Sequence, residues 1–199
     1  EGDNPLGWSV TAKVNARDDG PLGSFETVTL HGRKKDRPDF DYNISVSRTG
    51  NDIIVSLDRA NHTGTPVEID DMDYMVTCDA HLGGTIDRWL SFGTSSVLDQ
   101  YYNLTLVRDF PFLIRGQNDV NRQKMYEVCH LVRNMDSGHV ILIGHLTVNK
   151  GHSRFQIDRR DDSDRMKMSA WCTYNVTMPD NKGFSGEKIL LHLGSDGIR

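Results

Sequence analysis

The chain has 199 residues, of which 37% are hydrophobic and 26% are charged, and its formal net charge is −5. This composition is typical of a folded globular protein and excludes a disordered chain. The acidic charge is a poor match for a protein that tracks nucleic-acid phosphates. No stretch approaches the length of about 18 apolar residues that a membrane-spanning helix needs. We therefore expect no nucleic-acid partner and no membrane span.

Alternation of apolar and polar residues, the period of a β-strand, dominates the first half of the chain. It predicts strands over residues 7–14, 25–31, 40–46 and 53–57. The last two are joined by a turn at 48–51 into a predicted hairpin.

The middle of the sequence is less regular. A longer, interrupted strand region is expected over 67–78, followed by a loop at 81–85 and one helical turn within 86–92. Further strands are expected at 101–107 and, as a short edge strand, at 111–114.

Residues 118–135 fit both a helical stripe and a strand. We favour the strand, because the turn at 134–138 and the apolar run 140–148 would complete a hairpin. The run 140–148 is apolar on both faces, which indicates a central strand covered on both sides.

The clearest alternation lies in residues 165–178, and further strands are expected at 155–157 and 189–193. The face predicted to point inward carries Met166, Met168, Ala170, Cys172, Tyr174, Val176 and Met178.

Turn signals recur about every 10 to 15 residues, which is typical of a sandwich or a barrel. We therefore predict an all-β fold, an antiparallel two-sheet β-sandwich with at most one or two short helices. A closed lipocalin-like β-barrel is the alternative. No repeat or linker divides the sequence, so a single β domain is expected over residues 1–199.

Two short patterns resemble known β families. Residues 76–80 with Trp89 resemble the B-to-C strand signature of immunoglobulin domains, which implies a sandwich. Glu127 stands two positions before the next cysteine, where that family has Tyr, so the likeness indicates a shared β-sandwich pattern and not membership. Residues 7–8 with residues 97–102 resemble the outer motifs of lipocalins, which implies a barrel.

Four sequons of the form Asn-x-Ser/Thr point to secretion and N-glycosylation. Three of the asparagines alternate with apolar neighbours in predicted strands and so face outward. The candidate glycosylation sites are Asn43, Asn61, Asn103 and Asn175.

Three cysteines, Cys78, Cys129 and Cys172, are candidates for disulfide bonding. An odd number in a secreted protein predicts one disulfide and one free or intermolecular thiol, which permits a disulfide-linked dimer. The sequence does not decide between a disulfide joining Cys78 to Cys172 and one joining Cys78 to Cys129.

Motifs for local chemistry are missing from the sequence. There is no G-x-S-x-G, no G-x-G-x-x-G and no G-x-x-x-x-G-K-[ST]. The eight histidines form no H-x-H or H-E-x-x-H pattern, and the acidic runs at 70–73 and 158–164 lack the spacing of a calcium loop. We expect no cofactor, no metal site and no enzymatic activity.

Irregular loops on rigid sheets commonly carry binding sites. The candidate binding residues lie in the segments 78–98 and 158–165, and they are His81, Arg88, Trp89, Arg159, Arg160, Asp161 and Asp162.

From these patterns we predict a secreted glycoprotein that acts as a non-enzymatic binding module for a protein or cell-surface ligand. The alternative is a carrier of a small hydrophobic molecule in a barrel or sandwich cavity, supported by the methionine-rich face of 166–178. The third hypothesis is a hydrolase whose catalytic triad assembles only in space.

Overall fold

The computed structural model describes residues 7–20, 23–69, 74, 76–93, 103–106, 129–159 and 164–195. Nearly all regular structure in these residues is β-strand, and they contain no α-helix. The 3-10 turn η2 spans Ile86–Arg88. None of their helical segments is long and apolar enough to cross a membrane. The all-β prediction is confirmed, and η2 is the helical turn expected within 86–92.

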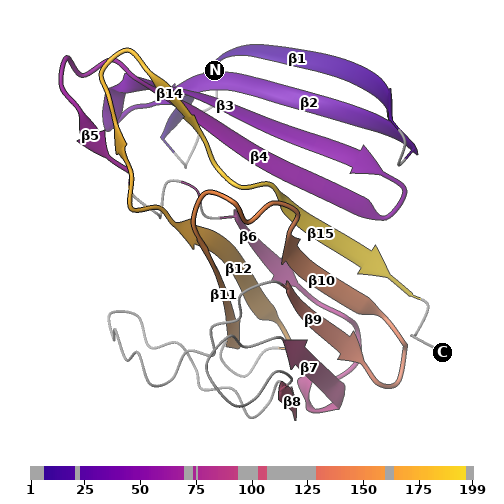
Figure 1. The fold of residues 1–199 in the computed structure, drawn as a ribbon. Helices are drawn as coiled ribbons and strands as arrows, with labels where there is room; N and C mark the ends of the chain where they lie inside the picture. Colours follow the sequence, from indigo (N-terminus) through magenta and orange to yellow (C-terminus); the bar gives the residue numbers. More distant parts are fainter. Residues whose placement is uncertain are drawn as a thin grey trace.

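The main sheet has ten strands in antiparallel pairing (Figure 1). Its order is β1-β2-β3-β4-β15-β10-β9-β7-β8, and β14 also pairs with β4. Because β1 and β8 end this path without pairing to each other, the sheet is open and the closed-barrel alternative is wrong. The strands are β1 (Trp8–Gly20), β2 (Gly23–Lys34), β3 (Arg37–Thr49), β4 (Asp52–Asn61), β7 (Trp89–Gly93), β8 (Asn103–Leu106), β9 (Cys129–Asn134), β10 (Val140–His145), β14 (Gly183–Ser185) and β15 (Ile189–Gly194).

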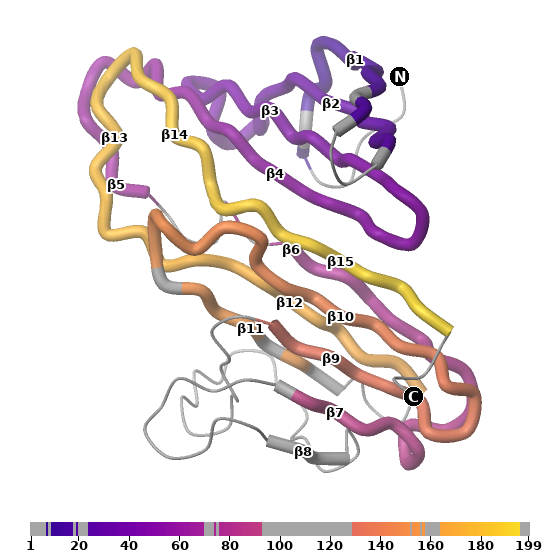
Figure 2. The backbone as a smooth tube through the Cα atoms, turned by 45° about the vertical axis from the view of Figure 1, so that its right-hand side comes forward, coloured from indigo at the N-terminus to yellow at the C-terminus, as the bar shows by residue number. Residues whose placement is uncertain are grey.

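A second, three-stranded sheet has the order β11-β12-β6, and a two-stranded sheet pairs β13 with β5. These strands are β5 (Val67–Glu68), β6 (Val76–Ala80), β11 (His152–Arg159), β12 (Met166–Thr173) and β13 (Thr177–Met178). The three-stranded sheet lies beside β9, β10 and β15, whereas β1 and β2 lie away from it (Figures 1 and 2). Two antiparallel layers of this kind form a β-sandwich, as predicted.

Two apolar clusters fill the space between the elements. The larger cluster joins β9, β10 and β15 to the three-stranded sheet and includes Trp89, Ile143, Phe155, Met166 and Met168, all fully buried. The smaller cluster lies under β3 and includes Phe40, Tyr42, Tyr74, Cys172 and Tyr174.

The predicted central strand and the predicted inward face are found, with one correction. β10 is buried at five of its six residues and pairs with β9 on one side and β15 on the other. In β12, Met166, Met168 and Ala170 are fully buried, but Ser169 on the opposite face is buried too. Val176 is 39% exposed because β12 ends at Thr173, so the alternation there no longer describes a strand.

The structure also settles the ambiguous segment at its carboxyl end. Residues 129–134 form β9, which is joined to β10 as a hairpin, so the strand was the correct interpretation there. The hairpin predicted over 40–46 and 53–57 is present as β3 and β4. The expectations for 111–114 and 118–128 lie outside the described residues.

Candidate functional site

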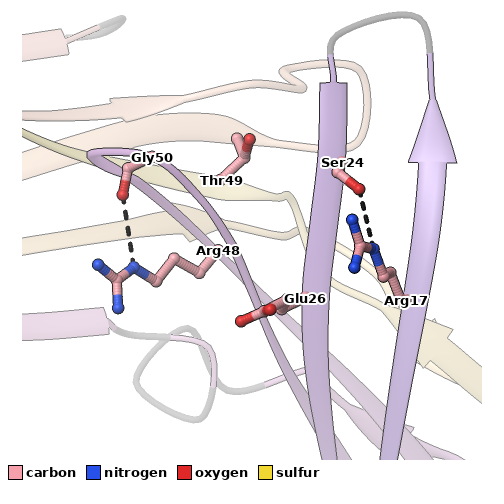
Figure 3. A pocket seen from close by; sticks show the side chains of 6 residues that line it. All are labelled: Arg17, Ser24, Glu26, Arg48, Thr49 and Gly50. Atoms are coloured by element: carbon pink, nitrogen blue, oxygen red, sulfur yellow. Dashed lines mark hydrogen bonds between the residues drawn. The ribbon is translucent and has the colours of Figure 1, made fainter.

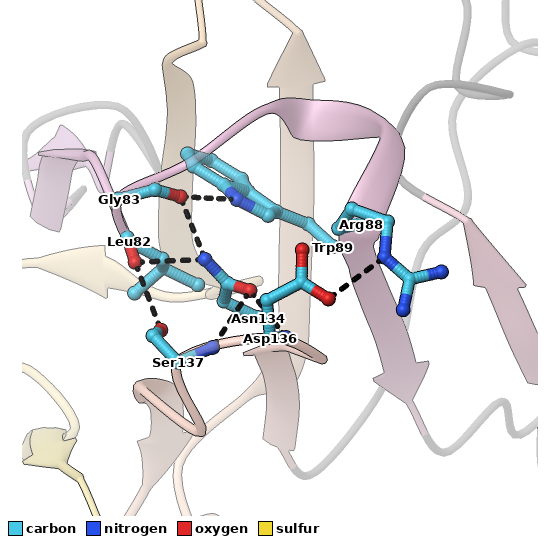
Figure 4. Close-up of polar contacts among 7 residues, drawn as sticks. All are labelled: Leu82, Gly83, Arg88, Trp89, Asn134, Asp136 and Ser137. Carbon is cyan, nitrogen blue, oxygen red and sulfur yellow. Dashed lines mark hydrogen bonds and ion pairs between the residues drawn. The ribbon is translucent and has the colours of Figure 1, made fainter.

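The loop predicted to bind a ligand around His81, Arg88 and Trp89 is part of the scaffold. Trp89 is fully buried, and its Nε1 donates a hydrogen bond to the carbonyl oxygen of Gly83 at 3.0 Å. Arg88 Nε lies 3.0 Å from Asp136 Oδ1 (Figure 4). The ring of His81 packs edge-on against the Trp89 ring, with centroids 6.0 Å apart. These contacts anchor the loop, and Trp89 has no surface left for a ligand.

Asn134, which the sequence did not single out, is the centre of this anchor. Its Nδ2 donates to the carbonyl oxygens of Leu82 and Gly83 at 3.1 and 2.6 Å. Its Oδ1 accepts from the backbone N–H groups of Asp136 and Ser137 at 2.8 and 3.3 Å (Figure 4). An asparagine that opens a turn in this way gives a local sequence signal, because its side chain bonds the backbone two residues later.

The second predicted binding loop is not described. Arg159 is the last residue of β11, and its side chain lies outside the described part of the chain together with Arg160, Asp161 and Asp162.

The four sequon asparagines have different environments. Asn61 is fully buried, and its Nδ2 donates to the carbonyl oxygens of Thr65, Met178 and Pro179 at 2.8 to 3.2 Å. A glycan on this nitrogen is incompatible with those bonds. Asn43 is half-buried, Asn175 is exposed, and the side chain of Asn103 in β8 is outside the described residues.

The structure contains no disulfide among the three cysteines, so the predicted bridge is absent. Cys78 pairs in register with Met168, and Cys172 lies four residues further along β12, about 13 Å away along the strand. Cys129 lies in the other sheet. Burial raises the pKa of Cys78 to about 11 and also raises the pKa of Cys129, so both thiols are protonated at neutral pH.

Two pairs have the spacing of a nucleophile and a base, but neither reaches solvent. Ser91 Oγ lies 2.6 Å from His130 Nε2, and both residues are fully buried. Cys172 Sγ lies 3.7 Å from His145 Nδ1, and both residues are again buried. A nucleophile must meet its substrate, so these pairs do not form the triad of a hydrolase.

A polar row crosses the free end of strands β1 to β3. Arg17 pairs in register with Glu26, and Glu26 pairs with Arg48, so the three side chains lie side by side on one face of the sheet. They border an open cavity of about 380 Å³ (Figure 3). The cavity is lined by Arg17, Ser24, Glu26, Arg48, Thr49 and Gly50.

The two arginines of this row are turned away from the glutamate between them. Arg17 Nε donates to Ser24 Oγ at 3.1 Å, and Arg48 Nε donates to the carbonyl oxygen of Gly50 at 3.4 Å (Figure 3). Within the described part of the chain, Glu26 forms no hydrogen bond or ion pair with either arginine. Arg17 also forms an ion pair with Asp19, whose Oδ1 lies 3.8 Å from Arg17 Nε. The row therefore presents the Glu26 carboxylate and two guanidinium groups that still have unused hydrogen-bond donors.

On the opposite face of the same strands, the polar side chains form hydrogen bonds with one another. Thr27 and Ser47 share a hydrogen bond of 2.8 Å between their hydroxyl groups, and Thr29 and Ser45 do the same at 2.8 Å. These polar groups already satisfy each other, so we take the row of Arg17, Glu26 and Arg48 as the candidate functional site.

The fold is similar to that of domains in carbohydrate enzymes. Neither a protein-family model nor a curated protein sequence matches the chain. Among solved structures, the galactosidase domain of alpha-galactosidase-sucrose kinase AgaSK superposes with a TM-score of 0.65 at 8% identity, covering 96% of this chain and 28% of that one. The GH36 alpha-galactosidase AgaA from Geobacillus stearothermophilus gives 0.65 at 10% identity, covering 98% and 29%.

A smaller protein is also similar. The galactose mutarotase related enzyme from Lactobacillus acidophilus superposes with a TM-score of 0.52 at 8% identity, covering 93% of this chain and 73% of that one. The chain therefore spans less than a third of the two galactosidases and most of the mutarotase-related enzyme. At such low identity these likenesses establish the fold.

The predicted function is corrected by these findings. The similar structures named here are carbohydrate enzymes or their domains, and none of them is a protein-binding module or a barrel carrier. The spatial triad is also excluded for the two described pairs, because their side chains are buried.

Proposed function

We propose that this chain is the β-sandwich domain of a carbohydrate-processing protein and that it binds a saccharide at the row of Arg17, Glu26 and Arg48. The proposal is supported by the fold likeness to galactosidase domains and to a mutarotase-related enzyme. The chain spans 28–29% of the two galactosidases and 73% of the mutarotase-related enzyme.

The observation that carries the proposal is the uncommitted carboxylate of Glu26 between two guanidinium groups. A carboxylate accepts hydrogen bonds from two hydroxyl groups at once, and a guanidinium group donates several from a planar fork. Adjacent hydroxyl groups of a sugar ring offer matching donors and acceptors. The cavity of about 380 Å³ falls in the range of small-molecule sites.

We further propose that the domain binds its saccharide without cleaving it. Hydrolysis of a glycosidic bond generally requires a pair of carboxyl groups on either side of the bond. Glu26 is the one carboxylate among the six residues that line the cavity. Incubation of the protein with aryl galactosides, and polarimetry of freshly dissolved galactose, test this part of the proposal; turnover that Glu26→Gln abolishes would contradict it.

The binding proposal is tested by titration calorimetry with methyl α-galactoside and a panel of neutral monosaccharides. We expect Glu26→Gln and Arg48→Ala each to weaken binding about tenfold or more, because hydrogen bonds to charged groups are lost. Glu68→Gln, an exposed carboxylate on β5, is the matched control and should leave binding unchanged. Absence of binding to every sugar, or full affinity in Glu26→Gln, would overturn the proposal.

Secretion and N-glycosylation rest on the sequons, and we keep them as proposals for Asn43, Asn103 and Asn175. The exposed side chain of Asn175 supports them most directly.

A further inference from the structure

The polar row of the candidate site is followed on the same face of the sheet by apolar rows. Val28 pairs with Val46, and Val46 pairs with Val55, two residues along from Glu26 and Arg48. Side chains two residues apart share a face of the sheet, and their rows lie about 7 Å apart. The polar row and this valine row are therefore direct neighbours.

A second apolar row continues the same surface. It contains Leu30, Ile44 and Leu57, again in register, about 13 Å from the polar row. All six side chains of the two rows are partly exposed, and Val46 is 37% exposed. We call these six residues (Val28, Val46, Val55, Leu30, Ile44 and Leu57) the apolar strip.

The second layer of the sandwich does not extend to the strip on β2. At its β4 end the strip meets the core, because Leu57 packs against the smaller apolar cluster. The three-stranded sheet lies beside β9, β10 and β15, at a distance from β1 and β2 in both views of the chain (Figures 1 and 2). The strip is also bordered on β1 by Asn15, which pairs with Val28, and by Lys13, which pairs with Leu30. The apolar strip therefore has polar residues of β1 along one side, and the row of Arg17, Glu26 and Arg48 lies at one of its ends.

We propose that the site takes a glycoside with an apolar aglycone, an alkyl or aryl glycoside, whose sugar contacts the row of Arg17, Glu26 and Arg48 while its aglycone lies along the apolar strip. This inference rests on the proposed saccharide binding and names its ligand class. An amphiphilic ligand matches the surface, because hydroxyl groups meet the charged row and hydrocarbon meets the valines next to it.

The experiment compares methyl α-galactoside with octyl α-galactoside, below the concentration at which the octyl compound forms micelles, and with 1-octanol. Burial of part of the octyl chain should make the octyl galactoside bind at least tenfold more tightly than the methyl compound. 1-Octanol should bind more weakly than the octyl galactoside, because it lacks the sugar.

A matched pair of variants locates the aglycone. Val46→Asn should remove most of the gain from the octyl chain and leave the affinity for methyl galactoside unchanged. Val14→Asn alters a valine of β1 that is 49% exposed and points to the opposite face, since it pairs with Thr29, and should change neither affinity. Circular dichroism confirms that both variants fold.

The outcomes separate the two proposals. Binding of the methyl galactoside with no gain from the octyl chain would overturn this inference and leave saccharide binding standing. Failure of both galactosides to bind would overturn both. Equal binding of 1-octanol and octyl galactoside, or a dimer in sedimentation that Val46→Asn dissociates, would show that the strip serves a different occupant and would overturn the inference.

Discussion

At the scale of single residues, the buried environment of His145 lowers the pKa of its side chain. His145 is the last residue of β10, and its ring packs against Phe155 with centroids 4.8 Å apart. Burial lowers the pKa of its imidazole, and hydrogen bonding to the backbone of Arg154 and the charge of Glu187 oppose this only in part. The folded state therefore holds His145 in its neutral form.

This environment predicts that acid destabilises the fold. The unfolded chain takes up a proton at His145 near pH 6.5, whereas the folded chain does so only at lower pH. The contribution of His145 is therefore fully present above about pH 6.5 and is lost as the pH falls toward the lower pKa of the folded state. Urea unfolding at pH 7.5 and 5.5 should show a smaller free energy of unfolding at pH 5.5.

The control for this pH effect is the comparison of two variants. His145→Gln should flatten the loss of stability between the two pH values, while His81→Gln, which alters an exposed histidine, should keep it. An NMR titration in which the His145 ring protonates at or above pH 6.5 in the folded protein would contradict the prediction.

At the scale of elements, the link between the 81–85 loop and the β9–β10 hairpin determines how the edge of the main sheet is held. Asn134 bonds to two carbonyl groups of the loop and to two N–H groups of the hairpin turn. Gly138, at a φ of +75°, closes that turn, and its N–H donates to the carbonyl oxygen of Asn134. One buried side chain therefore fixes two elements at once.

Removal of this side chain should be costly. We expect Asn134→Ala to lower the free energy of unfolding by about 3 kcal/mol, because buried backbone groups lose their partners. Arg88→Ala breaks only the ion pair with Asp136, whose side chains are both 58% exposed, and should cost less than about 1 kcal/mol. Chemical denaturation of both variants measures the difference, and equal losses would refute the assigned role of Asn134.

At the scale of the whole molecule, packing and not covalent cross-linking holds the sandwich together. The cysteines are free thiols, and the two apolar clusters join the layers. A chain of 199 residues buries enough apolar surface to fold without disulfides.

This view predicts that reductant has no effect on thermal stability. The Tm should be the same with and without dithiothreitol, and three thiols per chain should react with a thiol reagent after unfolding under non-reducing conditions. Before unfolding, Cys78 should react slowly at neutral pH, because burial raises its pKa to about 11. A count of one reactive thiol per unfolded chain, or a dimer that reductant dissociates, would show that the protein contains a disulfide and would contradict this prediction.

The sequence by itself determined the local part of this protein. The period of two predicted the antiparallel strands, the β3–β4 and β9–β10 hairpins and the doubly covered β10, because side-chain alternation is a property of the strand itself. The sequence did not reveal the candidate site, since Arg17, Glu26 and Arg48 lie on three strands and form no motif.

Only the tertiary structure decided what each polar residue does. Cross-strand register made neighbours of Arg17, Glu26 and Arg48, and the packing of distant segments buried Trp89 and Asn61, two residues whose sequence patterns had suggested exposed roles. The physical reason is that alternation assigns a side chain to a face, whereas the partners on that face, and the layer that covers it, come from segments far away in the sequence.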